Sequence, residues 1–373
     1  MRLVLDTETT SYNKGDITDS RNRLLCVALF DGDTCFVLQP NEENLQFIQS
    51  KLDEASLVVG HNFKFDLKWL HKYGLEVKCP IRDTMIVEYI LSKQNWSYPS
   101  LDECCEKRFG EKKFDYIKEN YWNLGRDTSE VPWVDLRDYV AQDCRLTWKL
   151  DDDQQKRVEP HQHTLIRLSC QDMEVLTEIE ENGCKFDREG SLQEAAKYEE
   201  EIKAIEKDLN LSHSVPNFNW SSTYHLSALL YGGEIKEPYK EQIGFFKGGQ
   251  RMGQPKYTNK IRVHILPRLF TPIAGSELAT DGVYSSEEQY LVQLKGPANK
   301  MVEKILKMKG MQKNVRTYLR GIPEKQVEKH QADMSYVYGN FSQVRTDTGR
   351  IGCSNTNLQN LSVEVEKFFV SRY

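Results

Sequence analysis

The chain contains 373 residues, which is long for one domain. Of these residues 39% are hydrophobic and 28% are charged, a composition typical of globular proteins. No apolar run approaches the ~18 residues that a membrane-spanning helix needs. An acidic residue already stands at position 6, which argues against a signal peptide. These features exclude an integral membrane protein and predict a soluble, intracellular protein of two domains.

The charge of the chain is unevenly distributed. A formal net charge of -6 argues against a partner such as nucleic acid. Residues 241–330, however, contain 16 Lys and Arg against 8 Asp and Glu, a balance of +8. This basic stretch fits either contact with phosphates or a solvated, lysine-rich loop, and charge alone does not separate the two.

The first 160 residues predict an α/β domain, because short apolar strands alternate with amphipathic helices and indicate a mixed sheet flanked by helices. The predicted strands are residues 2–5, 24–30, 34–38 and 57–60. The predicted helices are residues 43–52, 63–71, 83–91, 101–109 and 135–150. The run 151–153 continues the last helix as a solvated face, and Pro160 then ends the domain.

A mainly α-helical region follows over residues 161–335. A helix with an apolar face ends at Gly183, and Ser191 with Glu194 predicts a capping box for the next helix. Residues 233–282 are rich in glycine and lysine and are predicted as an insertion of hairpin and loop. Helices are expected again near residues 287–294, 300–308 and 311–319.

Four acids and a tyrosine are the candidate functional residues of the first domain. Asp6 and Glu8 end the first strand, where residues i and i+2 share a face. Asp66 lies at a strand-to-helix junction, and Tyr139 and Asp143 lie four apart on a helix, again on one face. Converging carboxylates repel each other unless cations bind them. Their hard oxygens suit two Mg²⁺ or Mn²⁺ ions, which would clamp a phosphodiester.

The three motifs, in this order, resemble those of the DEDD exonucleases, in the branch that has tyrosine in the third motif. Residues 83–86 and 100–103 resemble connecting segments in the proofreading domain of family A DNA polymerases. The resemblance implies a ribonuclease H-like fold and hydrolysis of DNA from its 3′ end. It also implies that Asn62 and Phe65 contact the frayed primer terminus.

The resemblance further assigns roles to the acids. It implies that Asp6, Glu8 and Asp143 hold the metal ion that binds the attacking water, and that Asp6 and Asp66 hold the second ion. Glu8 and Tyr139 are the expected catalytic residues, with the Tyr139 hydroxyl positioning the water.

The second half resembles the thumb and the start of the palm of the same polymerases. Residues 174–187 and 217–230 resemble thumb elements, and residues 346–351 with 357–360 resemble the entry to the palm, placed at 336–373. Side chains of Arg, Asn and Gln suit a duplex minor groove, because acceptors occur there at every base pair. By this resemblance the expected DNA contacts are Arg350, Asn357, Gln359 and Asn360.

The resemblance ends before the palm aspartates and the fingers of the family. It therefore suggests the N-terminal half of a phage-type family A polymerase, split or truncated, with a second polypeptide that carries palm and fingers. Several apolar side chains near the C-terminal end of the chain would then be left without the palm sheet that buries them, namely Ile351, Leu358, Leu361, Phe368 and Phe369. Two alternatives stay open, an RNA-trimming exonuclease of the same superfamily and a non-catalytic DNA clamp or assembly subunit.

Overall fold

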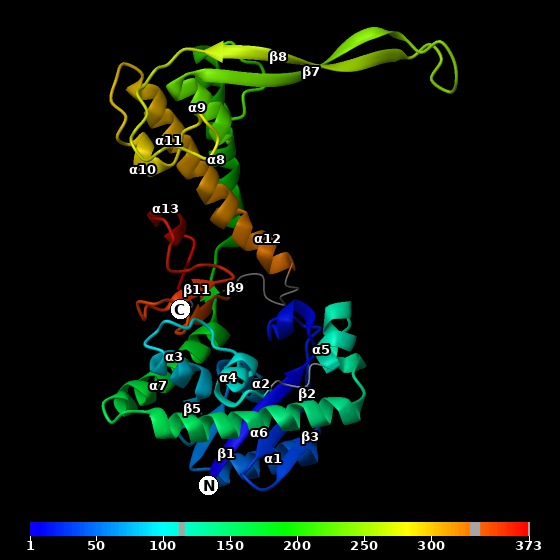
Figure 1. Cartoon of the computed structure of the whole chain (residues 1–373), viewed down its shortest axis with the longest axis vertical. Coiled ribbons are helices and arrows are strands. Elements are labelled where there is room, and N and C mark those ends of the chain that lie inside the picture. The colour runs from blue at the N-terminus through cyan, green and yellow to red at the C-terminus, as the bar shows by residue number, and fades with distance from the viewer. Residues whose placement is uncertain (112–115, 329–335, 372–373) are drawn as a thin grey trace. The chain divides into compact units, whose positions relative to one another are not determined.

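The computed structural model describes residues 1–111, 116–328 and 336–371 (Figure 1). The chain divides into two compact units, Met1–Arg188 with Ile322–Tyr373, and Glu189–Gly321. Within the described ranges, none of the helices combines the length and the apolar composition that a bilayer crossing needs. The domain boundaries that the sequence predicts at residues 160 and 335 stay predictions.

A mixed sheet forms the centre of the first unit, as the sequence predicts, and the structure adds a fifth strand to the four predicted ones. Its strand order is β3-β2-β1-β4-β5, with β1 antiparallel to β2 and parallel to β4. The strands are β1 (Arg2–Thr9), β2 (Leu24–Phe30), β3 (Cys35–Leu38), β4 (Leu57–Gly60) and β5 (Ile81–Asp83). β1 is longer than predicted because its polar end pairs with β2 as far as Thr9 and Leu24. The three-residue β5 has too short an apolar run to be predicted.

Helices cover both faces of this sheet. They are α1 (Glu42–Glu54), α2 (Lys64–Lys72), α3 (Thr84–Leu91), α4 (Leu101–Phe109), α5 (Tyr116–Asn120), α6 (Trp133–Arg157) and α7 (Gln162–Asn182). Leu3 and Leu5 of β1 belong to the core that includes residues of α1, α2, α3 and α7. Val4 belongs to a second core with Val140 of α6. Because side chains alternate along a strand, Asp6 and Glu8 continue the Val4 face, toward α6.

The acidic run at the end of α6 is not uniformly solvated, in contrast to the prediction. The Asp151 side chain is fully buried and pairs with Arg2 at 2.7 Å and with Arg82 at 2.8 Å. Removing one partner would leave a buried charge uncompensated, which is costly. These pairs join α6 to β1 and β5, and only the packing of those elements could reveal them.

Short elements complete the first unit, one directly after α7 and the others from the end of the chain. They are β6 (Cys184–Lys185), β9 (Tyr336–Val337), β10 (Asn340–Ser342), β11 (Gly352–Ser354) and α13 (Val363–Glu366). β6 pairs with β9, and β10 pairs with β11. The prediction that Phe368 is left unburied is wrong. The Phe368 side chain is buried, and the rings of Phe368 and Phe369 both pack against Phe186. Ile351 does remain exposed.

The second unit is mainly helical. It contains α8 (Arg188–Leu209), α9 (Thr223–Tyr231), α10 (Glu288–Leu291), α11 (Asn299–Asn314) and a π-helical turn (Val315–Leu319); α12 (Gly321–Glu328) begins at its end. The predicted capping box is wrong, because α8 already begins at Arg188 and the buried Ser191 hydroxyl donates to the carbonyl of Leu319.

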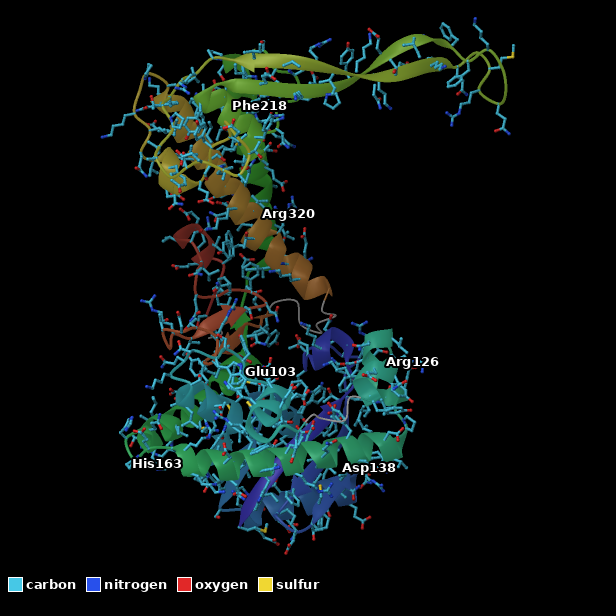
Figure 2. All side chains as sticks on the ribbon, in the orientation of Figure 1. Glu103, Arg126, Asp138, His163, Phe218 and Arg320 are labelled. Carbon is cyan, nitrogen blue, oxygen red and sulfur yellow. The ribbon has the colours of Figure 1, made fainter. Side chains whose placement is uncertain are left out.

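The predicted insertion contains a long antiparallel ribbon, β7 (Gly233–Phe245) and β8 (Pro255–Leu266). The ribbon extends away from α9, and its side chains stand out on both sides (Figure 2). Its basic residues are therefore largely in contact with solvent.

Candidate metal centre

Three of the four predicted acids form one group. Carboxylate oxygens of Asp6, Glu8 and Asp143 all lie within 4.8 Å of one another. Asp6 and Glu8 come from one face of β1, and Asp143 comes from α6, which packs on that face. The donors are all hard oxygens at a spacing that one cation can bridge, so the residues fit Mg²⁺ or Mn²⁺.

Asp66 lies beside this group but outside it. Its side chain is buried, and its Oδ1 accepts hydrogen bonds from the amide and the hydroxyl of Thr7, at 2.8 and 2.6 Å. Thr7 alternates with Asp6 and Glu8 along β1, so Asp66 reaches the strand from the α2 side. Burial raises the pKa of Asp66 to about 7, although both Thr7 donors act in the opposite direction. A nearby cation would favour the ionised form.

Tyr139 stands one turn before Asp143 on α6 and faces the same acids. Its ring is 9% exposed and packs edge-on against Trp122, with ring centroids 5.6 Å apart. Burial, and then the charges of Asp143, Glu8 and Asp6, raise the pKa of Tyr139 well above its ordinary value. The phenol therefore keeps its proton and can donate a hydrogen bond at the acid group.

Asp83 holds the turn that carries Asn62 and leads into α2, where Phe65 lies. Its buried carboxylate accepts hydrogen bonds from the amides of Asn62 at 3.1 Å and Phe63 at 2.8 Å, between β4 and α2. The same carboxylate caps α3 through the amides of Met85 at 2.8 Å and Ile86 at 3.4 Å. Asn62 adopts a left-handed φ of 59°, which asparagine tolerates better than most residues.

A cavity of about 580 Å³ opens beside the acid group, and we call it the metal-side cavity. It is lined by Glu8, Thr9, Ser11, Lys14, Gly15, Phe65, Trp122, Gly125, Arg126 and Thr128. Phe65, for which the resemblance implied a primer contact, lines this cavity. Lys14, Trp122 and Arg126 also line it and were not singled out from the sequence; Arg126 is labelled in Figure 2. Gly15 and Gly125 adopt left-handed φ angles in the two turns that carry these residues. The two glycines were the feature of the sequence that could have drawn attention to these turns.

The predicted duplex contacts lie around the β10–β11 hairpin, within the same unit. Arg350, Gln359 and Asn360 are exposed, whereas Asn357 is half-buried and its side chain accepts a hydrogen bond from the Gln359 amide at 3.1 Å. The contact of these four residues with DNA stays a prediction.

The fold and the acid group together define an α/β domain with a candidate site for metal-assisted phosphodiester hydrolysis. Comparison with known proteins supports the same class of reaction. Residues 2–159 match the family model described as 3′-5′ exonuclease, and residues 258–372 match the model described as DNA polymerase family A. The chain thus carries a region similar to 3′-5′ exonucleases at its N-terminal end and a second region similar to DNA polymerase family A.

Several DNA polymerases resemble the chain in sequence. DNA polymerase I of Rhizobium leguminosarum is 24% identical over 83% of the chain, and that of Borreliella burgdorferi is 24% identical over 87%. The matched regions are 27% and 30% of those two proteins, so the chain spans about a quarter to a third of their length. The DNA polymerase of Bacillus phage SP01 is 26% identical over 43% of the chain.

A solved structure shares the fold. The POL domain of Pol1 from M. smegmatis, in complex with DNA primer-template and dNTP, matches 99% of this chain and 54% of its own. The TM-score is 0.68 at 13% sequence identity, which establishes likeness of fold alone.

Proposed function

We propose that this chain hydrolyses terminal phosphodiesters of DNA from the 3′ end, as a proofreading exonuclease. One observation carries the proposal: the group formed by Asp6, Glu8 and Asp143 borders a cavity that Glu8 and Phe65 both line. The match of residues 2–159 to 3′-5′ exonucleases supports the same reaction. A terminal nucleotide in that cavity would bring its phosphate to the acids.

The acids would hold the metal ions in this proposal. Asp6, Glu8 and Asp143 would hold one ion, and Asp66 with Asp6 a second, once Asp66 is ionised. When bound, such ions supply activation of water and neutralisation of the leaving 3′ oxygen. The Tyr139 hydroxyl then orients the water through its hydrogen bond.

The aromatic and basic residues of the metal-side cavity would hold the terminal nucleotide. The rings of Phe65 and Trp122 offer faces or edges to a base, and Lys14 and Arg126 offer cations to phosphates. Such contacts depend little on sequence, which suits an enzyme that must remove any mispaired nucleotide.

Replacing Tyr139 by phenylalanine is expected to lower the rate of hydrolysis by about 10²-fold, the scale of one lost donor. The ring and its contact with Trp122 remain, so folding should be unaffected. The measurement is kcat on a single-stranded oligonucleotide at saturating Mg²⁺. A kcat equal to that of the unmodified protein would mean that Tyr139 only packs in the helix.

Mismatched 3′ ends are expected to be degraded faster than paired ends, because a terminal mismatch has already lost the energy that unpairing costs. The measurement compares two primers that differ in the last nucleotide only, annealed to one template. Equal rates would contradict a proofreading role. A matching RNA strand serves as the control, and its preferential degradation would favour the RNA-trimming alternative.

We also propose that the expected contacts, Arg350, Asn357, Gln359 and Asn360, bind primer-template DNA, and that nucleotide incorporation needs palm and fingers residues. A separate polypeptide with those parts stays a prediction, as does a phage origin. Incorporation should be undetectable with the purified chain and should appear when such a polypeptide is added. Incorporation by the chain alone would refute this proposal.

A further inference from the structure

One residue of β1 connects the three grouped acids with the fourth acid. Thr7 stands between Asp6 and Glu8, and because side chains alternate along a strand, its hydroxyl lies on the opposite face, where it meets Asp66 of α2. The side chains of Thr7 and Asp66 are both buried, with exposed fractions of 5% and 3%. Water therefore does not replace a hydrogen bond that is lost between them.

The edge of β1 is open where this contact is made. The parallel neighbour β4 pairs with β1 only from Arg2 to Val4, whereas β1 continues to Thr9. Beyond that pairing, Oδ1 of Asp66 accepts the backbone amide of Thr7 at 2.8 Å. The carboxylate thus takes the place of the carbonyl that a neighbouring strand would offer.

A second donor from the same residue fixes the orientation of this carboxylate. The Thr7 hydroxyl donates to the same Oδ1 at 2.6 Å, a length usual for a hydroxyl bonded to a carboxylate. A strand amide lies in the plane of its sheet, whereas this hydroxyl lies on the α2 face, so the two donors approach Oδ1 from different directions. Neither bond engages Oδ2, which makes Oδ2 the oxygen of Asp66 that a cation would take.

The covalent chain places this contact next to the grouped acids. The Thr7 nitrogen is bonded to the carbonyl carbon of Asp6, so an oxygen 2.8 Å from that nitrogen lies beside the backbone of Asp6. Asp6 in turn shares the acid group with Glu8 and Asp143. Hydrogen bonds that orient a ligating carboxylate typically change metal affinity by about 10–100-fold when they are removed.

We infer that Thr7 is a positioning residue, which holds Asp66 by Oδ1 and so keeps Oδ2 for a cation that Asp6 shares. The inference rests on the proposed exonuclease function and on its assignment of Asp6 and Asp66 to one ion. It adds a role for the residue between the two acids of β1. The ion assigned to Asp6, Glu8 and Asp143 should be insensitive to the Thr7 hydroxyl, because that hydroxyl lies on the opposite face of the strand.

The test measures binding of Mn²⁺ to the full chain by titration calorimetry, with thymidine 5′-monophosphate present to supply a phosphate. The unmodified protein should bind two ions. Thr7→Val keeps the size and branching of the side chain and removes the hydroxyl. It should weaken the second ion about ten-fold and the first less than about two-fold.

The same variant should shift the metal dependence of hydrolysis. The Mg²⁺ concentration that gives half of the maximal rate on a single-stranded oligonucleotide should rise about ten-fold. The rate at saturating Mg²⁺ should return close to that of the unmodified protein, because every group that touches the substrate is retained.

Matched variants separate the hydroxyl from general damage. Thr7→Ser keeps the hydroxyl and should bind both ions as the unmodified protein does, whereas Thr7→Ala should repeat the result of Thr7→Val. Thr177→Val removes another buried hydroxyl of the same unit, which donates to the carbonyl of Met173 at 2.8 Å on α7. Its thermal unfolding reports the effect of such a loss on stability, and its Mn²⁺ binding should be unchanged.

The failures of the inference and of the proposed function are distinguishable. Equal binding of both ions by Thr7→Val and the unmodified protein would overturn the positioning role and leave the exonuclease proposal standing. The same holds if Thr7→Ser or Thr177→Val weakens the second ion as much as Thr7→Val does, or if an active unmodified protein binds one ion only. An unmodified protein that binds no Mn²⁺ and hydrolyses no single-stranded DNA would overturn both.

Discussion

Replacing both Asp6 and Glu8 by alanine is expected to reduce degradation of single-stranded DNA by at least about 10³-fold, because the cation site loses most of its ligands. The two carboxylates lie within 4.8 Å of each other and of Asp143, so they repel each other in the absence of a cation. The double variant should therefore be as stable as the unmodified protein, or more stable by about 1 kcal/mol.

The measurement pairs the rate on a single-stranded oligonucleotide with thermal unfolding. Asp138→Ala is a matched control, because Asp138 lies on α6 (Figure 2), precedes Tyr139 in the sequence and has a side chain that is 65% exposed. This control should retain full activity. Chelation of divalent ions should abolish hydrolysis by the unmodified protein, and added Mg²⁺ or Mn²⁺ should restore it. Normal degradation by the double variant would refute the assignment of the acid group.

Replacing Asp83 by alanine is expected to destabilise the first unit by about 3–5 kcal/mol, because buried donors lose their acceptor and a helix loses its cap. The amides of Asn62, Phe63 and Met85, which lie 2.8–3.1 Å from the carboxylate oxygens of Asp83, would each lose that acceptor. The β4–α2 turn that presents Asn62 would also loosen, so KM for DNA should rise.

Urea unfolding followed by circular dichroism measures the loss of stability. Asp31→Ala removes a similar carboxylate that accepts two backbone amides, those of Asp33 and Thr34, in an exposed turn. Because water can replace an exposed acceptor, this control should cost less than about 1 kcal/mol. If both variants lost the same stability, burial of Asp83 would not be the cause.

The sequence by itself determined those relations that depend on local geometry. Asp6 and Glu8 share a face because strand side chains alternate, and Tyr139 and Asp143 share a face because a helix turns once in about four residues. In the structure both pairs keep their shared faces, and the packing of α6 on β1 then brings Asp6, Glu8 and Asp143 together. Most strands and helices of the first unit were likewise predictable from apolar periodicity.

Only the tertiary structure decided relations between residues far apart in the chain. Asp66 reaches β1 from the α2 side, through Thr7, and so stands outside the group of three acids. Asp151 is buried because β1 and β5 bring Arg2 and Arg82 to it, although the two residues that follow it in the sequence are acidic. The physical reason is common to both: local patterns specify the face of an element, whereas the partner opposite that face depends on how elements pack.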